Sequence, residues 1–245
     1  MGARWYGLSS SGRWQVESPP EIHFMPIVGP TGGLKLEALA ADTSPLGSLP
    51  LAELAAHDCW MVFASCLQVA DLQDHQPGVG LSVNVHPAYL EDRFLAARIA
   101  ELVAFTGLDP RLLTLEVTEC RSVDLSCQFV RKNLIGLHAM GMSLAIDDFG
   151  AGYATAAQVK ALCGVFSFRY LKLDMSLMQG WASRAGLRKI RHAAYLAQRH
   201  GLEVVAEGIE TAEQLDFVRA QGWWAQGFFI GKKTVIETFK SWKLD

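Results

Sequence analysis

Short β-rich runs alternate with longer amphipathic stretches along almost the whole chain, and this alternation most restricts the possible folds. Eight runs have the composition of strands, at residues 23–28, 34–39, 80–85, 112–119, 143–149, 169–174, 203–208 and 225–230. The stretches expected to be helical are 51–72, 88–106, 125–140, 177–200 and 211–221. Strands that are separated by helices usually pair in parallel. Eight strands in this order predict an α/β fold, a (β/α)8 TIM-like barrel.

The first two runs depart from this pattern because only Gly29, Pro30, Thr31, Gly32 and Gly33 join them. So short a connection suits a hairpin, and we therefore expect an antiparallel first strand pair. The structural alternative is a doubly wound open sheet. Such a sheet should carry a GxGxxG turn after its first strand, and the sequence GPTGG does not match that pattern.

The chain has 245 residues, a length at which α/β barrels form a single domain. We expect a barrel domain over residues 21–245 and a short accessory N-terminal extension over residues 1–20. Apolar residues make up 50% of the chain and charged residues 19%, which favours a large packed core over disorder.

The same composition excludes several classes of protein. No uninterrupted apolar run reaches about 18 residues, so we expect no membrane insertion. The formal net charge is −3, so no basic excess draws the chain to DNA, RNA or an anionic membrane. The five cysteines are scattered without a CxxC pair, and the N-terminus lacks the apolar run of a signal peptide. These features predict a cytoplasmic protein.

Polar or ionisable residues stand near the C-terminal ends of successive strands. They are Glu37, Asn84, Glu116 and Glu119, Asp147 and Asp148, Lys172 and Asp174, Glu207 and Glu210, and Gln226. In a barrel these ends converge on one face, where active sites are built. Single carboxylates at such positions can also be solvated loop residues or helix N-caps. Several like charges buried together are costly unless a cation neutralises them, which favours a metal site.

The ligand chemistry restricts the metal. Oxygen donors without a His or Cys cluster suit Mg²⁺ or Mn²⁺. The adjacent Asp147 and Asp148 can serve two ions about 3.5–4 Å apart, the arrangement used for phosphodiester hydrolysis. Lys172 and Asp174 alternate onto one strand face, so Lys172 either acts on the attacking water or forms a structural ion pair with Asp174.

Seven short motifs follow one another along the chain. They are LEAL (36–39), SVNV (82–85), LEVTE (115–119), DDFGAGY (147–153), LKLD (171–174), AEGIET (206–211) and QG (226–227). In this order and at these spacings they resemble the EAL-domain phosphodiesterases, which hydrolyse the bacterial second messenger cyclic di-GMP (c-di-GMP). The resemblance runs from about Pro26 to about Gly231. It implies an eight-stranded barrel with an antiparallel first pair, and opening of one 3′–5′ phosphodiester bond to give linear pGpG.

The resemblance also implies roles for individual residues. It implies two divalent cations, Mg²⁺ or Mn²⁺, with inhibition by Ca²⁺. The first ion would be bound by Glu37, Asn84, Glu116 and Asp147, and the second by Asp147 and Asp148. Lys172 and Glu207 match the positions that hold the attacking water, with Glu207 as general base. Substrate binding or loop positioning is implied for Leu39, Glu119, Asp174, Glu210 and Gln226.

Two positions depart from the family pattern where the substrate would be held. Ala41 stands where relatives place an arginine that grips a substrate phosphate, and Met25 replaces a glutamine. The segment between Glu37 and Asn84 is also shorter than the family leads us to expect. Another cation, such as Lys35 or a residue of a partner chain, is an alternative partner for the phosphate.

Our interpretation is a metal-dependent c-di-GMP phosphodiesterase. The sequence leaves open whether it forms a homodimer through helices near residues 154–200. The rival is a non-catalytic c-di-GMP receptor or protein-interaction module on a partly altered barrel. The complete set of metal-site and catalytic residues favours the enzyme, and the missing contacts at Ala41 and Met25 favour the rival. A metal-dependent lyase or isomerase with Lys172 as base rests on fold analogy alone.

Overall fold

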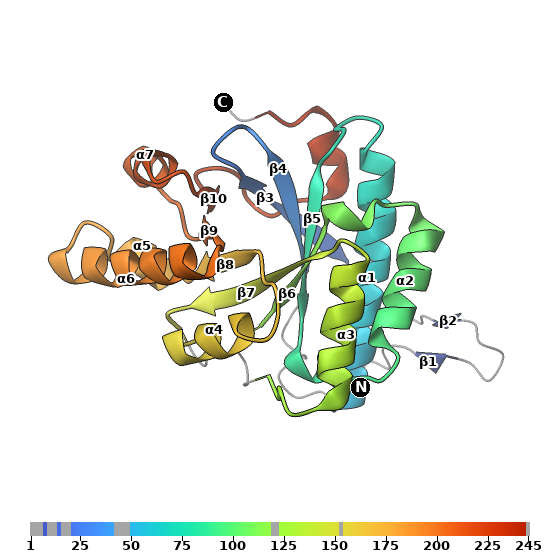
Figure 1. Cartoon of the computed structure of the whole chain (residues 1–245). Helices are drawn as coiled ribbons and strands as arrows, with labels where there is room; N and C mark the ends of the chain where they lie inside the picture. The colour runs from blue at the N-terminus through green and yellow to red at the C-terminus, as the bar shows by residue number, and fades with distance from the viewer. Residues whose placement is uncertain are drawn as a thin grey trace.

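A computed structural model describes residues 21–41, 50–118, 123–151 and 154–243, and the backbone alone for residues 7–8, 14–15, 51 and 52. A closed barrel forms in the strand order β10-β3-β4-β5-β6-β7-β8-β9. Its strands are β3 Ile22–Val28, β4 Leu34–Ala40, β5 Gly80–Val85, β6 Leu113–Val117, β7 Ser143–Phe149, β8 Tyr170–Leu173, β9 Glu203–Ala206 and β10 Trp224–Gln226. The predicted (β/α)8 barrel is confirmed (Figure 1).

Strand β3 runs antiparallel to both of its neighbours, β4 and β10, whereas the other neighbouring strands of the barrel pair in parallel. The β3–β4 turn is closed by a 2.7 Å hydrogen bond that Gly29 N donates to Gly33 O. The Trp224 ring lies against both glycines, so close that a Cβ on either would be 3.1 Å from it. The antiparallel first pair therefore agrees with the prediction. Strands β1 Gly7–Leu8 and β2 Trp14–Gln15 form a separate antiparallel pair.

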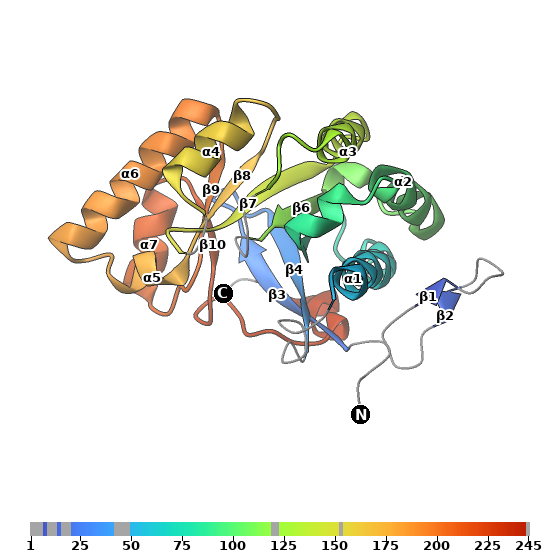
Figure 2. The ribbon, with the colours of Figure 1, turned by 90° about the horizontal axis from the view of Figure 1, so that it is seen from below.

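The helices surround the barrel in two groups, which Figures 1 and 2 show on opposite sides of the strands. One group is α1 Leu51–Leu72, α2 Leu95–Thr106 and α3 Gln128–Ala139. The other is α4 Ala156–Cys163, α5 Met175–Gln179, α6 Arg184–His200 and α7 Ala212–Ala220. Short 3₁₀ helices lie at η2 Pro87–Glu91, η3 Pro110–Leu112 and η4 Ile236–Ser241. No helix in the described ranges is both long and apolar enough to span a membrane.

Three predicted elements differ from the observed ones. The expected helix over 88–106 is divided into η2 and α2. The expected helix over 177–200 is divided into α5 and α6, because the side chains of Asp174 and Ser183 cap two separate helix starts. The last strand ends at Gln226 and does not continue to residue 230. A Cβ at Gly227 would lie 2.1 Å from Ile209 N, so the backbone turns there through a contact that only glycine permits.

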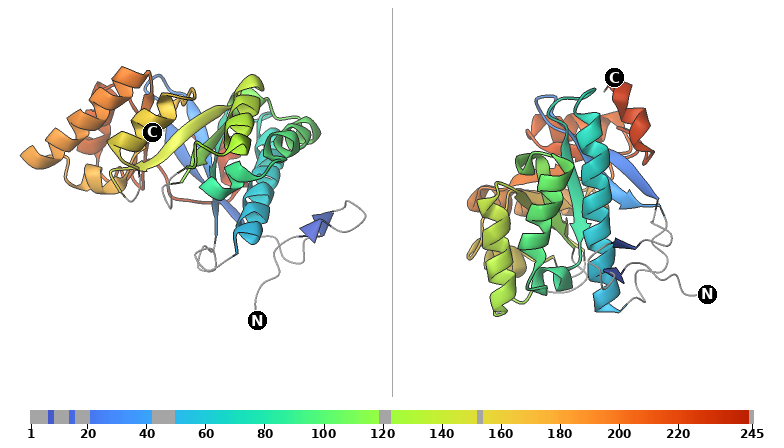
Figure 3. Two further views of the ribbon diagram at one scale, coloured as in Figure 1. Left: turned by 60° about the horizontal axis from the view of Figure 1, so that its bottom comes forward. Right: turned by 90° about the vertical axis from the view of Figure 1, so that its right-hand side faces the viewer.

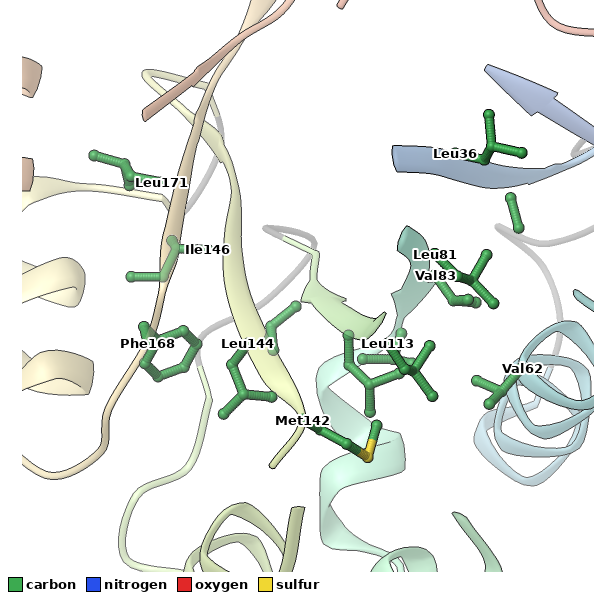
Figure 4. Close-up of a cluster of buried hydrophobic side chains, with 14 of the residues drawn as sticks. Leu36, Val62, Leu81, Val83, Leu113, Met142, Leu144, Ile146, Phe168 and Leu171 are labelled. Atoms are coloured by element: carbon green, nitrogen blue, oxygen red, sulfur yellow. The ribbon is translucent and has the colours of Figure 1, made fainter. Parts of the chain in front are cut away.

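The main hydrophobic core lies outside the barrel, between the strands and the helices. Alternate strand residues point outward, and Figure 4 shows Leu36, Leu81, Leu113 and Leu144 among the buried side chains, with Val62 of α1 facing them. Burial of each such side chain stabilises the fold by about 1.5–3 kcal/mol. This packing fixes which face of every strand is turned to the barrel interior.

The interior itself has two layers of side chains. The lower layer, toward the N-terminal ends of the parallel strands, contains a second apolar cluster with Trp224 packed against it, namely Ile27, Ala145, Tyr170 and Val205. Lys35 and Thr114 belong to this layer too, joined by a 2.8 Å hydrogen bond from Lys35 Nζ. Because side chains alternate along a strand, the residues two positions further on form the upper layer.

Candidate active site

The upper layer collects acidic and amide side chains from strands that are far apart in sequence. Glu37 lies on β4, Asn84 on β5, Glu116 on β6, Asp147 and Asp148 on β7, Lys172 on β8, Gln226 on β10, and Glu207 directly after β9. The sheet register brings Asn84 opposite Glu116, and it pairs Lys172 with Val205, two residues before Glu207. The structure therefore brings these eight predicted site residues together at one end of the barrel.

Lys172 lies at the centre of this group. Its Nζ atom is 2.5 Å from Glu116 Oε2, 2.7 Å from Glu207 Oε1, 2.9 Å from Asp147 Oδ1 and 3.5 Å from Glu37 Oε1. The lysine side chain is 2% exposed. One buried ammonium thus faces four carboxylates, and the group keeps an excess of negative charge that is costly in a low-dielectric interior.

Two amide side chains hold Glu37 from either side. Asn84 Nδ2 donates to Glu37 Oε1 at 2.8 Å, and Gln226 Nε2 donates to Glu37 Oε2 at 2.5 Å. The remaining amide oxygens, Asn84 Oδ1 and Gln226 Oε1, are buried without a hydrogen-bond partner among the described residues. Each is an oxygen donor of the kind that Mg²⁺ or Mn²⁺ accepts.

Burial and the charge of Lys172 act in opposite directions on the pKa of each carboxyl group here. Burial would raise the pKa of Glu37, but Lys172 and the two amide donors outweigh it, so this pKa lies below its usual value. Burial raises the pKa of Glu116 to about 7 although Lys172 opposes it, and Glu37 adds to the increase. Burial also raises the pKa of Glu207 well above its usual value.

The lysine responds in the opposite sense. Burial alone would lower the pKa of Lys172, but the carboxylates of Asp147, Glu116, Glu207 and Glu37 outweigh burial and raise this pKa well above its usual value. Lys172 is therefore an ammonium throughout the ordinary pH range.

One trio of carboxylates has the geometry of a cation site. Asp147, Asp148 and Glu207 each offer an oxygen, and these oxygens lie within 4.8 Å of one another. Asp148 is in the left-handed region, with φ at +50°, a conformation that costs about 1–3 kcal/mol and is often found at functional sites. With the two unpartnered amide oxygens nearby, the donor set fits hard divalent cations.

The site opens into a pocket of about 320 Å³. Except for Glu116, the eight residues brought together at this end of the barrel line the pocket, and Met25, Met175, Gly208, Glu210, Gly227 and Phe228 complete its wall. Met175 and Phe228 are 43% and 63% exposed, and the sequence analysis did not single them out. Phe228 could have been found from the sequence, because two phenylalanines follow directly after Gln226 and Gly227. We expected those phenylalanines to belong to the strand over 225–230.

Other predicted residues lie apart from the carboxylate group. Asp174 caps α5 by accepting a hydrogen bond from Ser176 N, so it is not the ion-pair partner of Lys172. Leu39 is half-buried on β4 and does not line the pocket. Glu210 lies at the pocket wall, and its backbone N–H donates to Gln214. Glu119 lies outside the described residues.

Lys35 does not reach the pocket, and its suggested role as a substitute for the missing arginine is therefore wrong. Its Nζ atom lies 3.7 Å from the centre of the Tyr170 ring in the lower layer. Burial lowers the pKa of Lys35 to about 7, although the charge of Glu116 opposes this. Residues 35 and 37 both face the barrel interior, but residue 35 belongs to the lower layer and residue 37 to the upper layer that forms the pocket. The side chain of Lys35 therefore lies away from the pocket.

The fold is a closed β/α barrel, and its carboxylate-lined pocket lies at the C-terminal ends of the parallel strands. These two features define the class of barrel proteins in which the strand ends supply the functional residues. Within that class the chain belongs to the EAL domain family, whose model matches residues 23–233.

Known relatives support this assignment. The chain is 33% identical over 209 residues to the cyclic di-GMP phosphodiesterase RocR of Pseudomonas aeruginosa, covering 79% of this chain and 52% of RocR. It is similar to the crystal structure of the EAL domain of Mycobacterium smegmatis DcpA, with a TM-score of 0.74, 28% identity, and coverage of 90% and 93% of the two chains. It also resembles a complex of the PaMucR phosphodiesterase with c-di-GMP, with a TM-score of 0.74, 25% identity, and coverage of 90% and 94%. The matched region covers 22% to 52% of several curated relatives.

Proposed function

We propose that this chain hydrolyses one 3′–5′ phosphodiester bond of c-di-GMP to give linear pGpG, with the help of two divalent cations, Mg²⁺ or Mn²⁺. The observation that carries the proposal is the charge of the upper layer. The carboxylates of Glu37, Asp147, Asp148 and Glu207 line one pocket, and Lys172 is the only Lys or Arg among its described lining residues. The buried carboxylate of Glu116 adds a further negative charge next to Lys172. Such an acidic group favours cations and, with them, a phosphodiester substrate.

The proposed ligands follow the donor atoms. Glu37, Asn84, Glu116 and Asp147 would hold one cation, and Asp147 and Asp148 the other. The buried Asn84 Oδ1 without a partner supports this assignment, as does the proximity of the Asp147 and Asp148 carboxylates. When bound, the cations would lower the pKa of the attacking water and offset the charge of the phosphodiester.

The chain's own residues would carry the proton. Bound cations would lower the pKa of Glu207, which burial raises, and keep this group a carboxylate. We propose that Glu207 accepts a proton from the attacking water as a new bond forms between the water oxygen and phosphorus. The bond between phosphorus and the 3′-oxygen then breaks, and the leaving oxygen takes a proton from solvent. Lys172, 2.7 Å from Glu207 Oε1, would orient the Glu207 carboxylate and offset the charge that develops on the phosphate.

The test is incubation of the purified chain with c-di-GMP, followed by separation of the nucleotides. We expect pGpG with Mg²⁺ or Mn²⁺ and none with EDTA or Ca²⁺, whose longer and looser coordination disturbs a tight two-metal site. Glu207→Gln should lower kcat by about 10²–10⁴ while c-di-GMP binding persists. Glu101→Gln, an exposed change of the same kind on α2, is the matched control. Full turnover in excess EDTA would refute the metal assignment.

A non-catalytic c-di-GMP receptor is the second candidate, and one observation favours it. Apart from Lys172, no Lys or Arg is among the described residues that line the pocket, and Ala41 and Met25 stand where relatives place phosphate-binding or polar side chains. Tight c-di-GMP binding without any pGpG in Mg²⁺ and Mn²⁺ would identify the receptor.

We also propose a cytoplasmic location and a barrel domain over residues 21–245 with residues 1–20 as an accessory extension. The four described cysteines, Cys59, Cys66, Cys127 and Cys163, are free thiols, which suits a reducing compartment. The loop-positioning roles of Glu119 and Glu210 and the homodimer stay predictions. Light scattering of the purified chain measures the oligomeric state.

A further inference from the structure

Positive charge is concentrated on one side of the molecule. Residues 154–202 contain eight of the chain's 22 Lys and Arg residues and one of its 25 Asp and Glu residues, Asp174. This segment therefore carries a formal charge of +7, and the rest of the chain carries −10. Lys172 is buried among four carboxylates and Arg169 pairs with Glu203, so the other six cations, which are all exposed, give this side its surface charge. The net charge of −3 for the whole chain does not show that positive and negative charges are separated in this way.

Helix α6 presents four of these eight cations in one row. Arg184, Arg188, Arg191, Tyr195 and Arg199 follow one another at intervals of four, three, four and four residues, which places them on one face of a helix. All five side chains are exposed, Tyr195 by 55%. We call these five residues the arginine row. At 1.5 Å per residue it is about 22 Å long.

The arginine row faces outward, and its arginines have no ion-pair partner in the part of the chain that the structure describes. The opposite face of α6 is buried through Ile190, Ala193 and Leu196, which orients the helix. Helix α6 lies at the outer edge of the molecule in Figures 1 and 2 and in the left view of Figure 3. None of the four arginines forms an ion pair with another described residue, and α6 contains no Asp or Glu.

We propose that the arginine row docks this protein on an anionic lipid bilayer, without insertion. A straight row of cations on a convex outer helix can touch a plane along its whole length. A helix with its side chains is about 10–12 Å across, and the Debye length is about 8 Å at physiological salt. The negative charges of the rest of the chain lie behind α6, so salt largely screens their repulsion of the lipid surface. Tyr195, in the middle of the row, has the amphipathic ring that is enriched at membrane–water interfaces.

Other occupants fit the row less well. A second copy docked through the same face would bring arginines against arginines, which is repulsive. Single-stranded nucleic acids are bound in basic grooves with several aromatic platforms, whereas this row is convex and holds one aromatic side chain. A lipid surface requires neither a groove nor base-stacking platforms, and clusters of four to eight cations on a helix are typical of anionic lipid binding.

The experiment is flotation of the full chain with vesicles. We expect binding to vesicles of equal parts phosphatidylcholine and phosphatidylglycerol at about 0.1 M salt, release at about 1 M salt, and no binding to phosphatidylcholine alone. The triple variant Arg184→Gln, Arg188→Gln, Arg191→Gln should bind about a hundredfold more weakly. The control is Arg131→Gln, Lys132→Gln, Arg219→Gln, which removes the same charge from exposed positions elsewhere and should bind as wild type.

Three results would overturn the proposal. The first is equal vesicle binding by the triple variant and the control variant. The second is binding to a DNA or RNA oligonucleotide without binding to vesicles. The third is a dimer that the triple variant loses, again without vesicle binding. Circular dichroism and thermal unfolding of both variants establish that they are folded.

Discussion

Replacing Lys172 by methionine tests the central electrostatic feature of the barrel. The substitution keeps much of the side-chain volume and removes the ammonium that lies within 3.5 Å of four carboxylates. Removing one partner of a buried ion pair costs about 3–5 kcal/mol, because the remaining charge is left uncompensated. For a domain of this size each kcal/mol lowers the unfolding temperature by about 2–4 °C, so in EDTA we expect a decrease of about 6–20 °C.

Two conditions should reduce this loss of stability. Saturating Mg²⁺ or Mn²⁺ supplies another positive charge to the same carboxylates, so the difference between variant and wild type should shrink. Acid should reduce it as well, because protonation removes the uncompensated charge. The pKa values of Glu116, at about 7, and of Glu207 are both raised by burial, so these carboxylates take up protons at a higher pH than exposed ones do. The raised pKa of Lys172 keeps the wild-type ammonium charged in both conditions.

The assay is thermal unfolding by circular dichroism in EDTA and in Mg²⁺, with Lys160→Met as control. Lys160 is exposed on α4, so its replacement changes the net charge equally and should alter stability by no more than about 0.5 kcal/mol. An unchanged unfolding temperature for Lys172→Met in EDTA would refute the reasoning. So would a deficit of the same size with and without the metal.

Three further predictions follow from other parts of the barrel. Ala41→Arg should tighten c-di-GMP binding about ten- to a hundredfold, measured by titration in Ca²⁺, because an arginine–phosphate contact is a strong charge-assisted hydrogen bond; unchanged affinity would mean a pocket rebuilt around another contact. The pKa of Lys35 is lowered to about 7 by burial, so the unfolded chain binds one more proton between about pH 7 and 10. Stability from this group should therefore rise over that range in wild type, and urea unfolding of Lys35→Met should lack this rise. Gly227→Ala should destabilise the fold by more than 1 kcal/mol, because the added Cβ would lie 2.1 Å from Ile209 N; an unfolding temperature equal to that of wild type would contradict this close approach.

Much of the barrel could be predicted because local patterns determine it. The spacing of the apolar runs located the strands to within a few residues, and the five-residue glycine-rich connection predicted that β3 runs antiparallel to β4. The end of β10 could not be predicted, because it depends on Gly227 meeting the backbone of Ile209, a contact between separate segments.

The site divides in the same way. Its members could be predicted because each ends a strand, and parallel strand ends meet. The arrangement around Lys172 could not, because Glu37 is 135 residues away from it in sequence and Glu116 is 56 residues away. Asp174 shows most clearly where prediction from strand alternation fails. Alternation placed it on the same face as Lys172, but a helix begins at that residue and uses its carboxylate as an N-cap.

The two layers inside the barrel also determine by which route a ligand can enter and leave the pocket. Beneath the carboxylates, the interior is filled by Ile27, Ala145, Tyr170 and Val205, with Trp224 packed against them. A filled barrel is not a pore. Any substrate and any product of the pocket must therefore use the same mouth, beside Met175 and Phe228. A new substrate molecule can enter only after the product has left. The rate of product release through this mouth therefore sets an upper limit on kcat, however fast the chemical step is.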